Sequence, residues 1–122
     1  MKDDFYILGS SPLETKRLEL QGARLEPVTR HLLQDLGLAE GMAVLDIGTG
    51  AGDVALLAAS LVGPSGHVVG IDRDANILVR ARERAQAAAL ERAVFETCSA
   101  GDAGRLGKFD LVVGRYTRRP IH

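Results

Sequence analysis

Residues 44–54 read Val-Leu-Asp-Ile-Gly-Thr-Gly-Ala-Gly-Asp-Val, and a second apolar run ends at Asp72, twenty residues after Gly52. An apolar strand that enters a glycine-rich turn and then a helix is typical of an α/β sheet that binds a nucleoside. The glycines let the backbone approach the ligand, and an acid at the end of the next strand accepts hydrogen bonds from ribose hydroxyls. The stretch therefore predicts a nucleoside-binding α/β fold.

The spacing of the glycines distinguishes between possible ligands. Gly48, Gly50 and Gly52 follow a GxGxG pattern, whereas the fingerprint for a dinucleotide is GxGxxG, with its third glycine on the helix. Asp53 occupies that position here, and its charge would repel a pyrophosphate at the helix N-terminus. Asp46 adds a second negative charge before the turn. A ligand with a cationic portion and no phosphate fits better, and S-adenosylmethionine, with its sulfonium and ammonium groups, is such a ligand.

Hydrophobic patterning predicts two helices, over 12–21 and 26–37, followed by alternating strands and helices. The apolar positions of the second helix form one stripe: Leu25, Val28, Leu32, Leu33 and Leu36. The later elements are expected as strand 43–47, helix 52–62, strand 67–71, helix 75–90, strand 93–97 and strand 109–113. Residues 100–108 are predicted to be a loop with at most a turn or two of helix, and the charged run 80–84 to be a solvated face. This alternation implies a parallel sheet with right-handed crossovers.

Three motifs over residues 44–116 resemble those of the class I S-adenosylmethionine-dependent methyltransferases. Residues 46–52 (Asp-Ile-Gly-Thr-Gly-Ala-Gly) resemble the first motif of that family, and 68–72 (Val-Val-Gly-Ile-Asp) the second-strand motif. Residues 109–114 (Phe-Asp-Leu-Val-Val-Gly) resemble the fourth strand, and 6–36 the helical lead-in of the small-molecule branch. The resemblance implies a Rossmann-like parallel sheet of order 3-2-1-4 with helices on both faces, and S-adenosylmethionine as cofactor.

The resemblance also assigns roles to residues of the first two motifs. Gly48 and Gly50, with Thr49 between them, would let the turn approach the methionine part of the cofactor. Asp46 would meet the cofactor ammonium, directly or through water, and Asp72 would hold the ribose hydroxyls. Each position has a structural alternative: a plain turn for the glycines, a turn or capping acid for Asp46, and an N-cap for Asp72, although Asp74 is better placed as the cap.

Further contacts are expected around the adenine. Arg73 would lie along the adenine, or else is an ordinary solvated arginine. An acid often follows the third strand in the family, in a pattern like Phe-x-x-Gly-Asp-Ala. The register from Phe95 places Cys98 and Ser99 at the Gly-Asp of this pattern, and Ser99 with Ala100 is the preferred contact. Asp102, in a Gly-Asp-Ala triplet that arrives three residues late, is the alternative. Gly114 would sit beside the cofactor, and no catalytic base is identified.

Composition restricts the class of protein. The chain has 122 residues, 46% of them hydrophobic, and a formal net charge of -1, which implies no general attraction to nucleic acid or to an anionic membrane. Cys98 is the single cysteine, and His31, His67 and His122 lack metal-ligand spacing. The N-terminus lacks the apolar run of a signal peptide, so a cytoplasmic protein without a membrane span or a metal site is expected.

We expect a single domain over 1–122, with a helical lead-in at 1–40, a cofactor-binding core at 41–116 and an atypical tail at 117–122. Family members are longer, so the chain is expected to be truncated after the fourth strand. The open edge of that strand would then pair with a second copy in a homodimer or larger assembly.

Two functions follow from the resemblance. The first is a methyltransferase, or its cofactor-binding half, that acts on a small molecule. The second is a non-catalytic S-adenosylmethionine-binding module that needs a partner chain. No Asn/Asp-Pro-Pro-Tyr motif follows the fourth strand, so an oxygen or carbon acceptor is preferred to an amino group.

Overall fold

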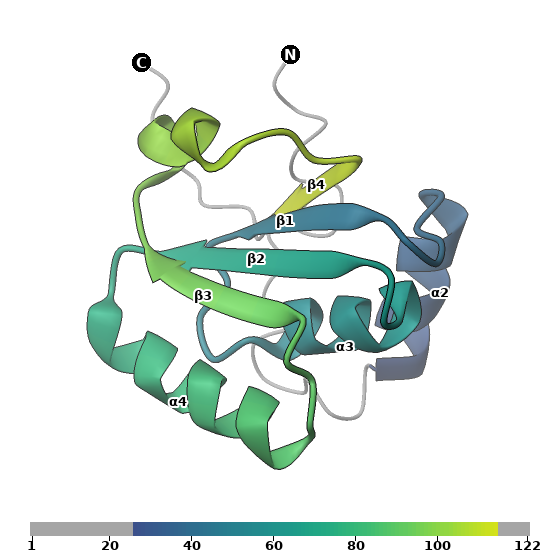
Figure 1. The fold of residues 1–122 in the computed structure, drawn as a ribbon, viewed down its shortest axis with the longest axis horizontal. Coiled ribbons are helices and arrows are strands. Elements are labelled where there is room, and N and C mark those ends of the chain that lie inside the picture. The colour runs from purple at the N-terminus through teal and green to yellow at the C-terminus, as the bar shows by residue number, and fades with distance from the viewer. Residues whose placement is uncertain (1–25, 115–122) are drawn as a thin grey trace.

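The computed structural model describes residues 26–114, drawn in colour in Figure 1. The helix expected over 12–21 and the tail 117–122 lie outside these residues. The described elements, in chain order, are α2 (Glu26–Asp35), β1 (Ala43–Ile47), α3 (Asp53–Val62), β2 (His67–Asp72), α4 (Ala75–Ala87), β3 (Ala93–Thr97), the 3-10 helix η2 (Ala100–Leu106) and β4 (Leu111–Gly114).

The four strands form one parallel sheet of order β3-β2-β1-β4, which confirms the predicted order. Val44 of β1 pairs with Val68 of β2 on one side and with Leu111 of β4 on the other. All four strands run the same way, so their carboxyl ends meet at one edge of the sheet. The glycine turn, the β2–α4 loop and the β3–η2 loop follow those ends, and ligands of open α/β sheets bind at this edge.

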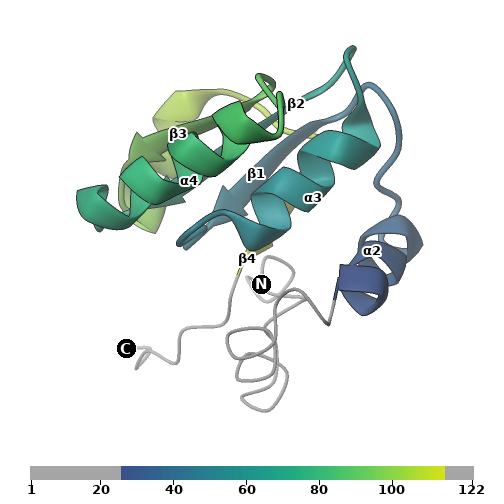
Figure 2. The same ribbon diagram turned by 90° about the horizontal axis from the view of Figure 1, so that it is seen from below.

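Helices α3 and α4 lie side by side across one face of the sheet, and α2 flanks α3 (Figure 2). Fully buried residues of β1, α3, β2 and α4 form the core between these layers: Val44, Ala55, Ala58, Val62, Val68, Leu78 and Ala81. Among the described residues, the opposite face is covered by η2, through the smaller cluster of Leu45, Ile71, Cys98 and Ala103. Helical segments therefore lie on both faces, and the one on the second face is a short 3-10 helix within 100–108, where a loop with at most a turn or two of helix was predicted.

The apolar stripe predicted for α2 is narrower in the structure. Leu33 is fully buried, whereas Val28 is 43% exposed and takes no part in the core. The helix ends at Asp35, two residues before the predicted limit, and Gly37 follows with a φ of 100°. A glycine with positive φ ends a helix without the steric cost that other residues meet there.

Two other predicted limits were wrong by two or three residues. Helix α4 ends at Ala87, because the chain leaves the helix at Ala88 and adopts a φ of 57° at Ala89. Strand β4 begins at Leu111, because Asp110 instead forms two hydrogen bonds with Ala43, the first residue of β1. Its amide donates to the Ala43 carbonyl at 2.8 Å, and its carboxylate accepts from the Ala43 amide at 2.9 Å.

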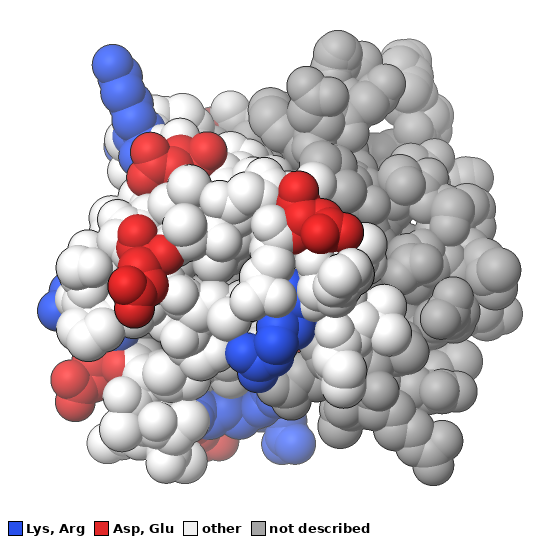
Figure 3. All heavy atoms as spheres, turned by 90° about the vertical axis from the view of Figure 1, so that its right-hand side faces the viewer, with Lys and Arg blue, Asp and Glu red and all other residues white. Residues whose placement is uncertain are grey.

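The opposite end of the molecule, where the strands begin, is seen in Figure 3. Acidic and basic side chains are interspersed with uncharged ones over the described part of this end. Within residues 26–114, no helix has the length and apolar character that a membrane span requires.

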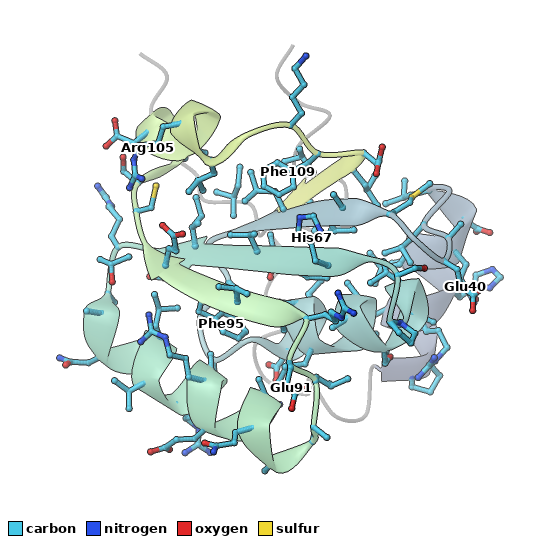
Figure 4. All side chains as sticks on the ribbon, in the orientation of Figure 1. Glu40, His67, Glu91, Phe95, Arg105 and Phe109 are labelled. Atoms are coloured by element: carbon cyan, nitrogen blue, oxygen red, sulfur yellow. The ribbon has the colours of Figure 1, made fainter. Side chains whose placement is uncertain are left out.

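Gly70 of β2 lies next to the side chains of Thr49, in the glycine turn, and of Phe95. These neighbours leave no room for a side chain at residue 70. A Cβ at this position would stand 2.7 Å from Thr49 Oγ1 and 2.9 Å from Phe95 Cδ1. The Phe95 ring lies between β3 and the helices α3 and α4 (Figure 4). The turn can therefore rest on β2 only because residue 70 is a glycine.

We predict that Gly70→Ala lowers the free energy of unfolding by about 1–3 kcal/mol, because the added methyl overpacks a filled space. Gly104→Ala is the matched control, since a Cβ there meets nothing within 4 Å, and it should change stability by less than about 0.5 kcal/mol. Urea denaturation measures both. Equal stability of the two variants would contradict this account of the turn.

Candidate functional site

The glycine turn after β1 depends on backbone conformations that favour glycine. Gly48, Gly50 and Gly52 have φ values of 74°, 57° and 90°, all in the left-handed region that other residues adopt at a cost. Gly52 is the N-cap of α3, so the turn passes directly from strand to helix. A Cβ on Gly52 would lie 3.2 Å from the Phe95 ring, which identifies this third glycine as a packing position.

The turn is fixed to β2 by backbone hydrogen bonds. The amides of Gly48 and Thr49 both donate to the Ile71 carbonyl, at 2.9 and 2.8 Å, and the Gly52 amide donates to the Thr49 carbonyl at 2.9 Å. A Cβ on Gly48 would meet nothing within 4 Å. The first glycine therefore presents bare backbone to open space, which is what a turn that approaches a ligand needs.

Asp46 lies beneath this turn and is 4% exposed. Its carboxylate accepts a hydrogen bond of 2.7 Å from the hydroxyl of Thr49, which is 2% exposed. A charge-assisted bond of this kind holds a buried carboxylate in one orientation. Thr49, predicted as a cofactor contact, thus also positions Asp46 under the turn.

Asp72 connects the ends of β1 and β2. Its Oδ2 accepts from the Gly50 amide at 2.9 Å, and its Oδ1 accepts from the Asp74 amide at 3.0 Å. A carboxylate has about four acceptor positions, so two remain for the hydroxyls of a diol. Asp74 is the N-cap of α4 and accepts from the Asn76 amide at 2.9 Å, which confirms that Asp72 is not needed as the cap.

The two alternatives for the adenine contact lie together in the structure. The Cys98 amide donates to the Asp72 carbonyl at 3.0 Å, which places the β3–η2 loop beside the end of β2. The Ser99 hydroxyl then donates to Asp102 Oδ2 at 3.1 Å, and the Asp102 amide donates back to the Ser99 carbonyl at 3.0 Å. Ala100 is the exposed first residue of η2. Asp102 lies three residues after Ser99 in sequence, and one turn of η2 thus brings its carboxylate back to the Ser99 hydroxyl.

The remaining predicted residues lie at the same edge of the sheet. Arg73 is exposed in the β2–α4 loop, and Gly114 is buried at the end of β4, where it pairs with Ile47 of β1. Among residues 26–114 there is no group of three or more His, Cys, Asp or Glu side chains that could hold a metal ion.

Arg84 is a site residue that the sequence analysis missed. Its Nη1 lies 2.8 Å from Asp53 Oδ1 and donates to the Ala51 carbonyl at 2.7 Å. Arg84 is partly buried and bonded to the turn, so the interpretation of 80–84 as a solvated face was wrong for this residue. Arg82 is exposed, as that interpretation expected, and also donates to the Phe95 carbonyl at 2.9 Å. Position 84 lies three residues after buried Ala81, and this helical spacing was the available signal.

The ion pair also changes one argument about the ligand. The charge of Asp53, which alone would repel a pyrophosphate, is offset by the guanidinium of Arg84. The GxGxG spacing and Asp46 therefore disfavour a dinucleotide more than Asp53 does.

Comparison with known proteins bears on this geometry. The sequence model for a methyltransferase domain matches residues 38–120. The chain belongs to the S-adenosylmethionine-dependent methyltransferases. Its cofactor is accordingly S-adenosylmethionine, and both the resemblance and the fold expected from the motifs are confirmed.

Individual relatives show how broad this family is. An arsenite methyltransferase of Halobacterium salinarum is 41% identical over 69 residues, covering 57% of this chain and 17% of that protein. A tRNA (guanine(6)-N2)-methyltransferase of Thermus thermophilus is 37% identical over 103 residues, covering 84% of this chain and 30% of that protein. The crystal structure of a SAM-dependent methyltransferase from Aquifex aeolicus superposes with a TM-score of 0.57 at 33% identity, covering 74% of this chain and 47% of that one. The chain thus spans less than half the length of each of these methyltransferases.

We predict that Thr49→Val lowers the free energy of unfolding by about 1–3 kcal/mol, because it removes a hydrogen bond from a buried carboxylate without changing the side-chain shape. Thr49→Ser keeps the hydroxyl and loses one methyl, at a cost of about 0.8 kcal/mol. Chemical denaturation of both variants gives the comparison. A valine variant as stable as the serine variant would show that the hydroxyl does not hold Asp46.

Proposed function

We propose that residues 1–122 form one S-adenosylmethionine-binding domain, with residues 41–116 as its core, that transfers a methyl group to a small molecule. The observation that carries the proposal is the junction of two strand ends. The Asp72 carboxylate lies against the Gly50 amide with acceptor positions to spare, and the backbone at Gly48 faces open space. The free acceptor positions of Asp72 suit the hydroxyls of a ribose. The open backbone at Gly48 suits the methionine part of the cofactor, which would lie close to it.

Each part of the cofactor has a partner in this proposal. Asp72 accepts hydrogen bonds from the ribose hydroxyls, and the backbone of Gly48 and Gly50 lies along the methionine part. The Asp46 carboxylate attracts the cofactor ammonium, directly or through water. Gly114, at the end of β4, leaves room beside the cofactor. The cofactor supplies an electrophilic methyl group on its sulfonium, and the protein's task is largely to orient it toward an acceptor.

For the adenine we propose that Ser99 and Asp102 act as a pair. The hydroxyl of Ser99 holds the Asp102 carboxylate at 3.1 Å, so the acceptor atoms would come from Asp102 and their placement from Ser99. Ala100 and Arg73 complete the surroundings of the adenine in this proposal.

A small molecule is our proposed acceptor, and the support comes from the charge and from one relative. The net charge of -1 and the dispersed basic residues give no electrostatic footprint for nucleic acid, and the arsenite enzyme of Halobacterium salinarum is named for an inorganic acceptor. The tRNA enzyme of Thermus thermophilus shows that the family also includes nucleic-acid acceptors. The proposal includes no membrane partner and a cytoplasmic location, both expected from the sequence.

The second candidate function is a non-catalytic binding module that needs a partner chain. Methyl transfer by the purified chain to small-molecule acceptors would exclude this candidate.

The junction at Asp72 gives a direct prediction for cofactor binding. Asp72→Ala should raise the Kd for S-adenosylhomocysteine by at least about tenfold, because hydrogen bonds to a charged group contribute about 1.5–3 kcal/mol each. Isothermal titration calorimetry measures the Kd.

Asp74→Ala is the matched control, because it removes the neighbouring carboxylate and an N-cap worth about 1 kcal/mol of stability without touching the proposed ribose site. Its Kd should stay within about twofold of the unmodified chain on the same scale. A folded Asp72→Ala variant that binds as tightly as the control would contradict the assignment.

We also propose that β4 pairs with a second copy of the chain. Among the described strands β4 has one neighbour, β1, and an apolar edge of this kind tends to recruit another strand. Sedimentation velocity at micromolar concentrations should show a dimer or larger species. A monomer at all concentrations would exclude this assembly.

A further inference from the structure

Helix α4 reaches the glycine turn through one side chain. Arg84 Nη1 donates to the carbonyl of Ala51 at 2.7 Å and lies 2.8 Å from the carboxylate of Asp53. Ala51 stands between the last two glycines of the turn, and Asp53 is the first residue of α3. One guanidinium nitrogen thus holds the chain on both sides of Gly52.

The turn needs such restraint because of its composition. Glycine has access to more backbone conformations than any other residue, and residues 48, 50 and 52 of this segment are all glycines with positive φ. The strand side of the turn is fixed by the Ile71 carbonyl and by Asp72. The contacts of Arg84 fix its helix side, and a guanidinium suits this task because it binds a carbonyl and a carboxylate with directed N–H groups.

We propose that Arg84 is a positioning residue for the cofactor turn. By holding Ala51 and Asp53, it keeps the Gly50 amide directed at Asp72 and the backbone of Gly48 open toward the ligand. This inference rests on the proposed function, because it takes the turn to be the place where S-adenosylmethionine binds. Arg84 acts through the backbone and is not assigned a contact with the cofactor.

A neighbouring arginine on the same helix offers a matched control. Arg82 also donates to a backbone carbonyl, that of Phe95 in β3, at 2.9 Å. Replacing either arginine with methionine removes one charge and one bond to a carbonyl from α4 and keeps much of the side-chain length, and Arg84→Met also removes the ion pair with Asp53. Only the Arg84 bond ends on the glycine turn.

Two measurements on Arg84→Met and Arg82→Met test the proposal. Calorimetric titration with S-adenosylhomocysteine should show a Kd raised about three- to tenfold for Arg84→Met and within about twofold of the unmodified chain for Arg82→Met. Hydrogen exchange by NMR, without ligand, should show faster exchange of the Gly50 and Gly52 amides in Arg84→Met alone.

An unchanged Kd together with unchanged exchange in Arg84→Met would overturn the proposal, as would equal effects of both variants, which would indicate a general loss of stability. If the unmodified chain does not bind S-adenosylhomocysteine, the proposed function fails. The exchange of the Gly50 and Gly52 amides still decides whether Arg84 orders the turn, because that measurement needs no ligand.

Discussion

The hydrogen bond from the Gly50 amide to the Asp72 carboxylate joins the two strand ends on which the candidate site is built. It requires the turn after β1 to fold over β2, which in turn requires a bare backbone at Gly70 beneath Thr49. It also requires positive φ values within the turn, which explains the glycines at alternate positions. The spacing GxGxG and the distant Asp72 are therefore parts of one local structure, although they are separated in sequence.

The elements of the sheet were predictable because their signals are local. The short apolar run 43–47 is typical of a strand buried on both faces of a parallel sheet. Strands 43–47 and 93–97 were both predicted with the limits that the structure has, although β3 lies at the sheet edge and exposes Val94 and Thr97. The strand order came from the resemblance to the methyltransferases and not from the periodicity. The predicted limits were wrong where tertiary contacts decide the end of an element. Asp110, for example, forms two hydrogen bonds with Ala43, and β4 therefore begins only at the next residue.

The candidate site was predictable in its backbone and less so in its side-chain contacts. Glycines and acids at strand ends mark the turn and the ribose position, because few other residues suit those conformations and charges. The pairing of Ser99 with Asp102 depends on a 3-10 helix that brings a later residue back to the loop. Arg84 reaches the turn from a segment that reads as an ordinary charged helix face, so its role becomes visible only once α4 is placed beside α3.

The central claim is that the carboxyl edge of this sheet binds S-adenosylmethionine through the turn and Asp72. The most direct test is an NMR titration of the isotope-labelled chain with S-adenosylhomocysteine. The account predicts saturable shifts concentrated in residues 48–52, 72–74 and 98–102, with α2 and the amino ends of the strands unaffected. Absence of saturable shifts in a folded chain, or shifts centred elsewhere, would contradict it.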